Sequence, residues 1–387
     1  MKNICVITGS RAEFGLLTPL LKRIQIDKKM NLKLVVTGSH LQKKYGNTKK
    51  EISEENIKIS KKINVFPKLN NIYSTLESIS IGLKKLNIFF KESKIDLLLI
   101  LGDRYEILAP AISATFYKIP IAHISGGDCT LGAIDDTVRH CLTKMAWLHF
   151  VSNSNSRKRV IQMGENPKRV FNVGNIGAER IKKIQSLSKK DIEQKLKIKF
   201  MKKNILVTFH PVTFDDNSSS RHLNEILKAL KKLTNTSIIF TYPNNDIESY
   251  NIIKIIENFV KKRKNYYVFK SLGFINYVSL LKQVDCVIGN SSSGLLEAPS
   301  LKIGTINIGD RQEGRLKAIS VLDCKPKKND ILKVINKIYS KQYKEIIKKT
   351  KNPYYKSNTT NIIYEKIKKF KKPTVLKKEF FNIKNYY

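Results

Sequence analysis

The sequence lacks the features that mark membrane and secreted proteins. No apolar run among its 387 residues reaches the roughly 18–20 residues that span a bilayer. The N-terminus enters a strand pattern at residues 4–7, without the charged and apolar regions of a signal peptide. The five cysteines are odd in number and scattered, and none belongs to a Cys-x-x-Cys pair. We therefore expect a cytoplasmic protein with free thiols and no membrane partner.

Acidic residues are scarce. The chain has 32 aspartates and glutamates against 72 lysines and arginines, which gives a formal net charge of +40. Such a charge suggests nucleic-acid binding. The lysines, however, are spread along the whole chain, and no recognition-helix, zinc-finger or aromatic RNA-binding motif accompanies them. We expect no nucleic-acid partner. A polyanion-binding protein is the non-enzymatic alternative, and steeply salt-dependent DNA binding would distinguish it.

What the sequence does contain is an alternation of short apolar strands and amphipathic helices. This pattern indicates an α/β fold with parallel sheets covered on both faces. Strands are predicted at residues 3–8, 32–36, 96–101, 119–124, 204–209, 236–241, 266–270, 286–289 and 304–308. The predicted helices of the first half are 14–26, 76–91, 106–116 and 135–148. We predict two Rossmann-like domains, residues 1–175 and 176–365, with an active site in the cleft between them and a basic tail at 366–387.

Polar clusters follow several predicted strands at the point where each ends. In the first half they are Gly9-Ser10-Arg11 and Gly102-Asp103-Arg104. In the second half His210 follows one strand and a run of serines follows another. Ligands bind at the carboxyl ends of strands in open α/β sheets. Clusters at several strand ends therefore predict a functional cleft.

The serine run, residues 289–300, is the most informative stretch. It follows a short buried strand and is predicted to open a helix. Serine hydroxyls and free backbone N–H groups at a helix start form a phosphate cradle. Glu297 lies one helical turn further on, where we expect its carboxylate to accept from a ribose hydroxyl. Hydroxyls for a diphosphate and an acid for a sugar suggest a nucleotide-sugar site.

Each charged candidate also has a structural interpretation. Arg11 offers a planar fork for phosphate oxygens, or it joins a surface ion pair. Asp103 ends an apolar strand, either as a cap or as an acid/base group. His210 stands before Pro211 at a strand end, as a structural or a functional histidine.

The loop at residues 123–128 runs towards a second acidic cluster. Asp135 and Asp136 lie at a predicted helix start, where one acid is explained by capping, but two acids and Asp128 exceed what a cap needs. The adjacent glycines at 126–127 are predicted to let a ligand approach closely. No metal is expected, because the nearby histidine and cysteines at 129, 140 and 141 lack zinc-ligand spacing.

Together these motifs resemble the hydrolysing UDP-N-acetylglucosamine 2-epimerases, most closely the bacterial sialic-acid-pathway branch. The similarity covers about residues 1–365. Its motifs occur in the same order at residues 9–15, 101–106, 126–128, 135–140, 209–211, 289–300 and 309–315. The resemblance implies a glycosyltransferase-B-like fold, a UDP-sugar substrate, no cofactor, and a homo-oligomer (dimer or tetramer). It implies conversion of UDP-N-acetylglucosamine and water to N-acetylmannosamine and UDP.

The resemblance also assigns residues by position. UDP contacts are implied for Arg11, Arg104, Ser291, Ser292, Glu297, Arg311 and Arg315. Acid/base roles are implied for Asp103, Asp135 and His210. The related non-hydrolysing enzymes carry a glutamate where this chain has Ser125. Because serine is a poor base, Asp128 or the pair Asp135 and Asp136 would take over its role.

The implied chemistry explains why such groups are needed. The proton on C2 of the sugar is not acidic, so a base removes it while UDP leaves C1, and water then adds to the unsaturated sugar. Three alternatives stay open: the same reaction on a diacetamido-trideoxy UDP-sugar, the non-hydrolysing epimerase, and a glycosyltransferase. The paired acids of the first half argue against the last of these.

Overall fold

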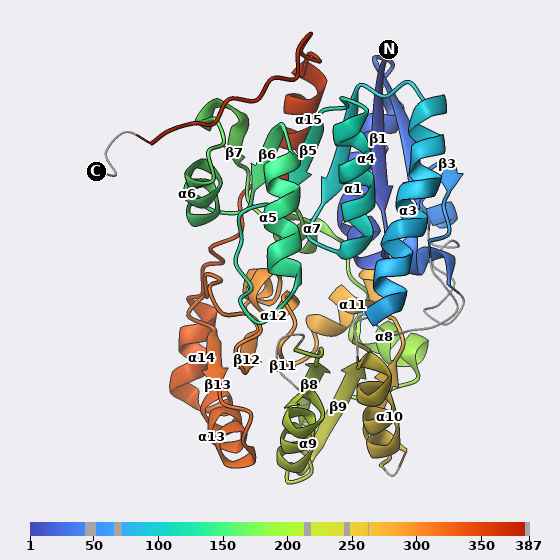
Figure 1. Ribbon diagram of the computed structural model, residues 1–387. Helices are drawn as coiled ribbons and strands as arrows, with labels where there is room; N and C mark the ends of the chain where they lie inside the picture. The colour runs from blue at the N-terminus through green and yellow to red at the C-terminus, as the bar shows by residue number, and fades with distance from the viewer. Residues whose placement is uncertain (43–51, 66–71, 213–217, 244–247, 262, 384–387) are drawn as a thin grey trace. The chain divides into compact units, whose positions relative to one another are not determined.

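The computed structural model describes residues 1–42, 52–65, 72–212, 218–243, 248–261 and 263–383 (Figure 1). The chain forms two compact units. Unit 1 comprises Met1–Asp128, Asp135–Glu179 and Tyr354–Tyr387, and unit 2 comprises Cys129–Ile134 and Arg180–Pro353. No helix of the described ranges is long and apolar enough to cross a membrane.

Unit 1 is built on a parallel sheet of seven strands in the order β3-β2-β1-β4-β5-β6-β7. The strands are β1 (Lys2–Thr8), β2 (Met30–Val36), β3 (Ile59–Lys62), β4 (Leu97–Leu101), β5 (Ile121–Ile124), β6 (Leu148–Val151) and β7 (Val170–Asn172). The strands β1 and β4 pair at the middle of the sheet. The strands β2 and β3 follow on the side of β1, and β5, β6 and β7 follow on the side of β4. The junction of β1 and β4 is therefore the topological switch point, where α/β sheets bind ligands.

Helices cover both faces of this sheet (Figure 1). They are α1 (Arg11–Ile26), α3 (Ile72–Glu92), α4 (Leu108–Phe116), α5 (Asp135–Met145), α6 (Ser154–Gln162), α7 (Ile176–Lys183) and α15 (Thr359–Lys369). The core on one face comes mainly from α1 and α15, and the core on the other from α3, α4 and α5. Burial on both faces explains why β4 is wholly apolar.

Unit 2 repeats the architecture with six parallel strands in the order β10-β9-β8-β11-β12-β13. They are β8 (Lys203–Thr208), β9 (Thr236–Thr241), β10 (Tyr266–Phe269), β11 (Cys286–Gly289), β12 (Gly304–Ile308) and β13 (Val321–Cys324). Its helices are α8 (Lys189–Leu196), α9 (Ser218–Leu230), α10 (Ser249–Val260), α11 (Phe274–Leu281), α12 (Ser293–Leu296), α13 (Lys328–Tyr339) and α14 (Lys341–Lys348). Here the switch point lies between β8 and β11. The predicted fold class, two Rossmann-like α/β halves with parallel sheets, is confirmed.

Two predicted elements differ from the structure. The helix predicted over residues 135–148 ends at Met145, because the Trp147 N–H donates to Ile121 O at 2.7 Å and draws the chain into β6. The serine run does not open a long helix: α12 has four residues and passes into a 3-10 turn at Ala298–Leu301.

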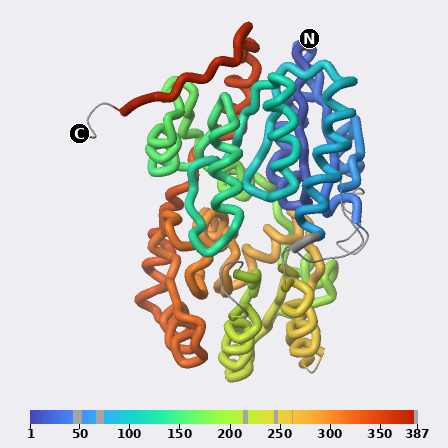
Figure 2. Tube along the Cα trace, viewed as in Figure 1, coloured from blue at the N-terminus to red at the C-terminus, as the bar shows by residue number. Residues whose placement is uncertain are grey.

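The C-terminal segment packs on unit 1. Ile363 and Ile367 of α15 lie in the same core as α1, so the chain from Tyr354 onward belongs to unit 1 and not to the predicted range 176–365. Beyond α15, the end of the chain passes α6 (Figure 2), where the Phe381 N–H donates to Gly164 O at 2.8 Å. The predicted basic tail is thus attached to the folded unit.

Candidate active site

The turn after β1 presents Arg11 at the start of α1. Ser10 caps this helix: its hydroxyl accepts from the Glu13 N–H, and the Glu13 carboxylate accepts from the N–H groups of Gly9 (2.8 Å) and Ser10 (3.3 Å). The loop after β2 supports the turn, because the Ser39 hydroxyl donates to Gly9 O at 3.0 Å. A cation in the first turn of a helix opposes the helix dipole. An anion bound beside Arg11 would relieve that opposition.

Arg139 of α5 joins three acidic segments of unit 1. Its side chain is 1% exposed. Nε donates to Asp103 Oδ2 at 2.9 Å, a second donor reaches the same oxygen, and Nη1 donates to Asp136 Oδ1 at 2.9 Å and to Asp128 O at 2.8 Å. Although burial opposes the charge, the Asp103 and Asp128 carboxylates hold the pKa of Arg139 above its usual range. The guanidinium therefore fixes the loops after β4 and β5 to α5.

Arg104 lies between two further acids. Its Nε is 3.4 Å from Glu106 Oε2, and its Nη1 is 4.0 Å from Asp135 Oδ1. Asp103 and Asp135 keep 23% and 15% of their side chains exposed, so both are within reach of a ligand. The neighbouring arginines hold these carboxylates in place.

Asp128 is held differently from the other predicted acids. It is 5% exposed, and its Oδ1 accepts from the Ser152 hydroxyl (2.8 Å), the Asn153 amide (3.1 Å) and the Ser156 hydroxyl. These donors come from the end of β6 and the start of α6. The carboxylate therefore ties the β5 loop to that turn.

The glycines at 126–127 are explained by packing. Gly127 has φ +77°, and a Cβ there would lie 2.6 Å from Ser156 O. A Cβ on Gly126 would lie 2.7 Å from the Thr143 hydroxyl. The helices α5 and α6 approach the backbone closely at this point, which accounts for both glycines without a ligand.

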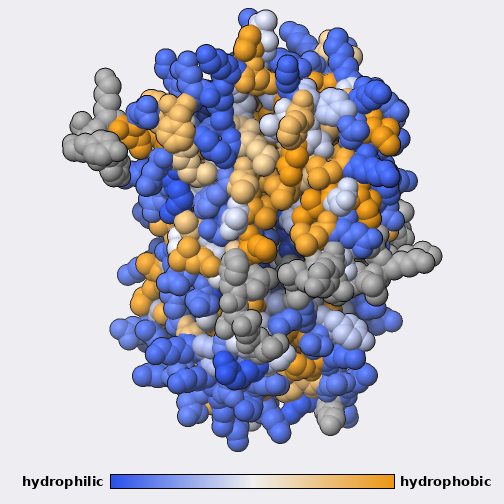
Figure 3. Space-filling view, in the orientation of Figure 1, coloured by the Kyte–Doolittle hydropathy of each residue, from blue (hydrophilic) through white to orange (hydrophobic). Residues whose placement is uncertain are grey.

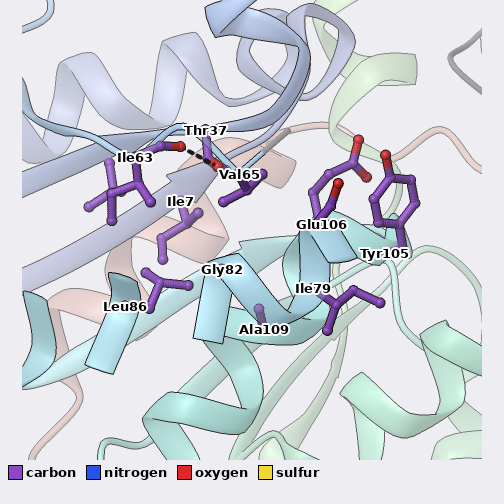
Figure 4. A pocket seen from close by; sticks show the side chains of 12 residues that line it. Ile7, Thr37, Ile63, Val65, Ile79, Gly82, Leu86, Tyr105, Glu106 and Ala109 are labelled. Atoms are coloured by element: carbon purple, nitrogen blue, oxygen red, sulfur yellow. Dashed lines mark hydrogen bonds between the residues drawn. The ribbon is translucent and has the colours of Figure 1, made fainter. Parts of the chain in front are cut away.

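A small pocket lies beside the site between the sheet and α3 (Figure 4). Its lining is mostly aliphatic. Glu106 and Tyr105 lie at one end of it, and Ile63 and Leu86 lie at the other (Figure 4). Glu106, which was not among the predicted site residues, thus faces both an apolar space and Arg104.

In unit 2, Asn290 connects the loops at three strand ends. It is 0% exposed. Its side chain accepts from the His210 N–H at 2.7 Å and donates to His210 O at 2.8 Å. Its carbonyl accepts from Gln312 Nε2 at 2.8 Å and from Arg311 Nη1 at 3.3 Å. Asn290 therefore fixes the loops after β8, β11 and β12 relative to one another.

Replacing Asn290 by alanine is expected to destabilise unit 2 by about 2–6 kcal/mol. The change removes the two hydrogen bonds between the Asn290 side chain and the buried His210 backbone, at about 1–3 kcal/mol for each bond. Urea unfolding followed by fluorescence measures the loss. Asn251→Ala, at an exposed position on α10, is the matched control and should change stability by less than about 0.5 kcal/mol. Equal midpoints for the two variants would contradict the role given to Asn290.

The serine run places its polar groups in a short turn. Gly289 has φ +137°, and a Cβ there would lie 1.9 Å from Thr208 O. Only glycine therefore fits at this end of β11, where it lies against β8. Ser293 donates to Glu297 Oε2 and also contacts the Tyr277 hydroxyl. Burial raises the pKa of Glu297, and the bond from Ser293 opposes that rise. Ser291 and Ser292 precede these contacts and are partly exposed.

The two predicted arginines after β12 differ in their surroundings. Arg311 is 9% exposed, and its buried Nε has no hydrogen-bond partner among the described residues. Arg315 is more exposed and donates to Gln312 Oε1 at 2.9 Å. A buried donor without a partner is rare and points to a missing ligand. Because the buried Nε of Arg315 is in the same situation, both arginines remain candidates for an anion contact.

The predicted residues fall into two groups, one in each unit. Unit 1 brings together Arg11, Asp103, Arg104, Asp128 and Asp135, and unit 2 brings together His210, Ser291, Ser292, Glu297, Arg311 and Arg315. Sequence reasoning missed the residues that hold these groups, namely Glu13, Glu106, Arg139 and Asn290. All four stand inside the recognised motifs, and Ser10-x-x-Glu13 was visible as a capping box.

Comparison with known proteins agrees with this architecture. The family model described as UDP-N-acetylglucosamine 2-epimerase matches residues 22–368. A Campylobacter jejuni protein named GDP/UDP-N,N'-diacetylbacillosamine 2-epimerase (hydrolyzing) is 40% identical over 89% of each chain. An Escherichia coli protein named polysialic acid biosynthesis protein P7 is 39% identical over 92% of this chain and 91% of its own.

Solved structures show the same fold. The structure of UDP-GlcNAc 2-epimerase from Neisseria meningitidis bound to UDP-GlcNAc matches with a TM-score of 0.80 and 21% identity, over 96% of this chain and 100% of the other. The fold is thus the glycosyltransferase-B-like one, with two Rossmann-like units. The chain belongs to the UDP-N-acetylglucosamine 2-epimerase family.

Proposed function

We propose that the protein is a hydrolysing 2-epimerase that converts UDP-N-acetylglucosamine and water to N-acetylmannosamine and UDP, for sialic acid biosynthesis. The observation that carries the proposal is the cluster of acidic side chains that Arg104 and Arg139 contact. It supplies carboxylates near the switch point of the unit 1 sheet. The relatives named as hydrolysing and as polysialic acid proteins support the reaction class and the pathway.

UDP contacts are assigned to groups in both units. Ser291, Ser292, Arg311 and Arg315 bind the diphosphate, and Glu297 binds the ribose. Arg11 and Arg104 of unit 1 stabilise the charge that develops as UDP leaves. The unpartnered Nε of Arg311 supports its part in this set, since a phosphate oxygen would accept from it.

The acid/base roles go to Asp103, Asp135 and His210. Asp103 is held by Arg139 while part of its side chain is exposed, which suits a base that takes the C2 proton. Asp135 and His210 are the candidates for protonating the UDP oxygen that leaves C1 and for directing water. The three hydrogen bonds on Asp128 favour a positioning role for that residue, which had been a candidate base.

The order of bond changes follows from these assignments. The base takes the proton from C2, the C1–O bond breaks, and UDP departs with the electron pair, which leaves an unsaturated sugar. Water then gives its hydroxyl to C1, and a proton reaches C2 from the opposite face, which inverts that centre. Charge builds up on the departing diphosphate, so the arginines and serines act most strongly at that step.

The same site supports one close alternative, turnover of a UDP-diacetamido-trideoxy sugar. The Campylobacter jejuni relative is named for a diacetylbacillosamine substrate, so the choice of sugar needs a direct comparison. We also propose a homo-oligomer, because Figure 3 shows apolar side chains gathered over α3–α5 and because Ile88 and Phe116 are exposed.

A substrate panel tests the proposal. Purified protein is incubated separately with UDP-N-acetylglucosamine and UDP-N,N'-diacetylbacillosamine, and released UDP and free sugar are separated by chromatography. The proposal expects UDP and N-acetylmannosamine in equal amounts from the first substrate, at the higher rate. Faster turnover of the second substrate would transfer the assignment to it. Formation of UDP-N-acetylmannosamine would indicate a non-hydrolysing epimerase.

A further inference from the structure

The serine run contains a third serine, Ser293, to which the UDP contacts assign no role. We propose that Tyr277 and Ser293 form a hydrogen-bonded relay that positions Glu297 to accept from a ribose hydroxyl of UDP. The inference rests on the proposed function, which gives the ribose contact to Glu297. Neither Tyr277 nor Ser293 touches the substrate in this scheme, so both are positioning residues that determine how strictly the ribose is recognised.

The relay connects α11 to the end of the serine run. The Ser293 hydroxyl donates to Glu297 Oε2, and the Tyr277 hydroxyl contacts the same Ser293 oxygen. The Ser293 N–H donates to Ser291 Oγ at 3.4 Å. The hydroxyl and the N–H of Ser293 are therefore both engaged inside unit 2. Ser291 and Ser292 are left as the serines of the run that can bind a diphosphate.

The chemistry of the three groups sets the direction of the two side-chain hydrogen bonds. An ionised carboxylate only accepts, so Ser293 uses its single hydroxyl proton on Glu297. The Tyr277 hydroxyl must then donate to Ser293. Burial, followed by the charge of Glu297, raises the pKa of Tyr277, so the phenol keeps its proton. A donor on the Ser293 oxygen polarises that hydroxyl and strengthens its bond to Glu297.

Packing holds both ends of the relay in place. Tyr277 lies in the first turn of α11, and its neighbours Val278 and Leu281 are buried in a core cluster of unit 2. The side chain of Tyr277 packs against that cluster, which also contains Ala298, the residue after Glu297. The Tyr277 hydroxyl is thus the polar end of an otherwise apolar contact. Such a hydroxyl needs a partner, and Ser293 is that partner.

Glu297 keeps the capacity to bind a ligand. Among the described residues, Ser293 is the one side-chain donor to its carboxylate. The residue is partly exposed, and an ionised carboxylate has about four acceptor positions. One donor fixes the orientation of the carboxylate and leaves most of these positions open. The ribose hydroxyls of UDP are donors of the kind that would fill them.

Ribose discrimination tests the relay. Calorimetry is performed with UDP, 2′-deoxy-UDP and 3′-deoxy-UDP. The wild type should bind at least one of the two analogues at least about tenfold more weakly than UDP, because a hydroxyl bound to a charged acceptor is lost. Tyr277→Phe should bind UDP about fivefold more weakly and bind that analogue as the wild type does. The penalty for the missing hydroxyl should therefore shrink about fivefold. A purely structural tyrosine would change the melting temperature and leave this penalty as it is.

Two further variants control the measurement. Tyr250→Phe removes the same atom from an exposed tyrosine on α10 and should keep the wild-type penalty. Ser293→Ala interrupts the relay at its middle and should shrink the penalty at least as much as Tyr277→Phe does. Because Tyr277 acts through Ser293, adding Tyr277→Phe to Ser293→Ala should change the penalty no further. Additive effects of the two substitutions would overturn the relay.

Kinetics separates positioning from chemistry. KM of Tyr277→Phe for the UDP-sugar should rise about fivefold while kcat stays within about twofold, because the ribose is remote from C1 and C2. A full wild-type penalty in Tyr277→Phe would overturn the role of Tyr277, and so would a wild type that binds both analogues like UDP. If Tyr277→Phe does not fold, an unchanged penalty in Ser293→Ala would overturn it. A wild type that discriminates the analogues but does not turn over a UDP-sugar would refute the proposed reaction and leave the relay standing.

Discussion

Asp103→Asn is expected to lower turnover of the UDP-sugar by about 10²- to 10⁴-fold, the range of a general base. The asparagine keeps an oxygen for Arg139, so the loop after β4 stays in place while the group that takes the C2 proton is lost. Steady-state kinetics with coupled UDP detection measures the effect. KM should change by less than about threefold, because the residue acts on the chemical step.

The control for this variant is Glu92→Gln, an exposed amide substitution at the end of α3 in the same unit. It should retain full activity. If Asp103→Asn also retained near-normal turnover with an unchanged melting curve, the base would have to be another group, and Asp135 would be the next candidate.

Arg139→Met is expected to destabilise unit 1 by about 3–5 kcal/mol, the cost of removing one partner from a buried ion cluster. The substitution leaves Asp103 and Asp136 without their common cation and leaves Asp128 O without its donor. Urea unfolding measures the loss. The residual folded protein should also be inactive, since Asp103 is no longer held.

An exposed arginine provides the comparison. Arg221→Met on α9 should change stability by less than about 0.5 kcal/mol. If Arg139→Met left both the unfolding midpoint and the activity at wild-type levels, the ion cluster would be needed for neither the stability of unit 1 nor the activity.

Most strands could be predicted because buried parallel strands have a local signature. The run ending at Gly289 is short, apolar and followed by polar residues, and β11 matches its predicted bounds. The strand β6 was missed because His149 interrupts its apolar run and the preceding helical pattern extends into it. His149 is buried with Glu165 at 3.0 Å, a long-range pairing that satisfies the imidazole inside the sheet.

The site was predictable as a set of strand-end groups but not as a network. Asp103 and Asp135 stand in visible motifs, whereas the role of Arg139 depends on contacts that span 36 residues of sequence. The same is true of Asn290, whose partner His210 lies 80 residues away. The spacing of residues along the chain does not predict such long-range contacts. Local rules therefore placed polar groups at strand ends without indicating which residues hold those loops in place.

The central claim is that this chain breaks the C1–O bond of a UDP-sugar and inverts C2 with solvent as the proton source. Incubation with UDP-N-acetylglucosamine in deuterium oxide, followed by proton NMR, tests it most directly. The account predicts free UDP and N-acetylmannosamine that carries deuterium at C2. Intact UDP-sugar, free N-acetylglucosamine with its C2 proton retained, or an epimer still attached to UDP would contradict it.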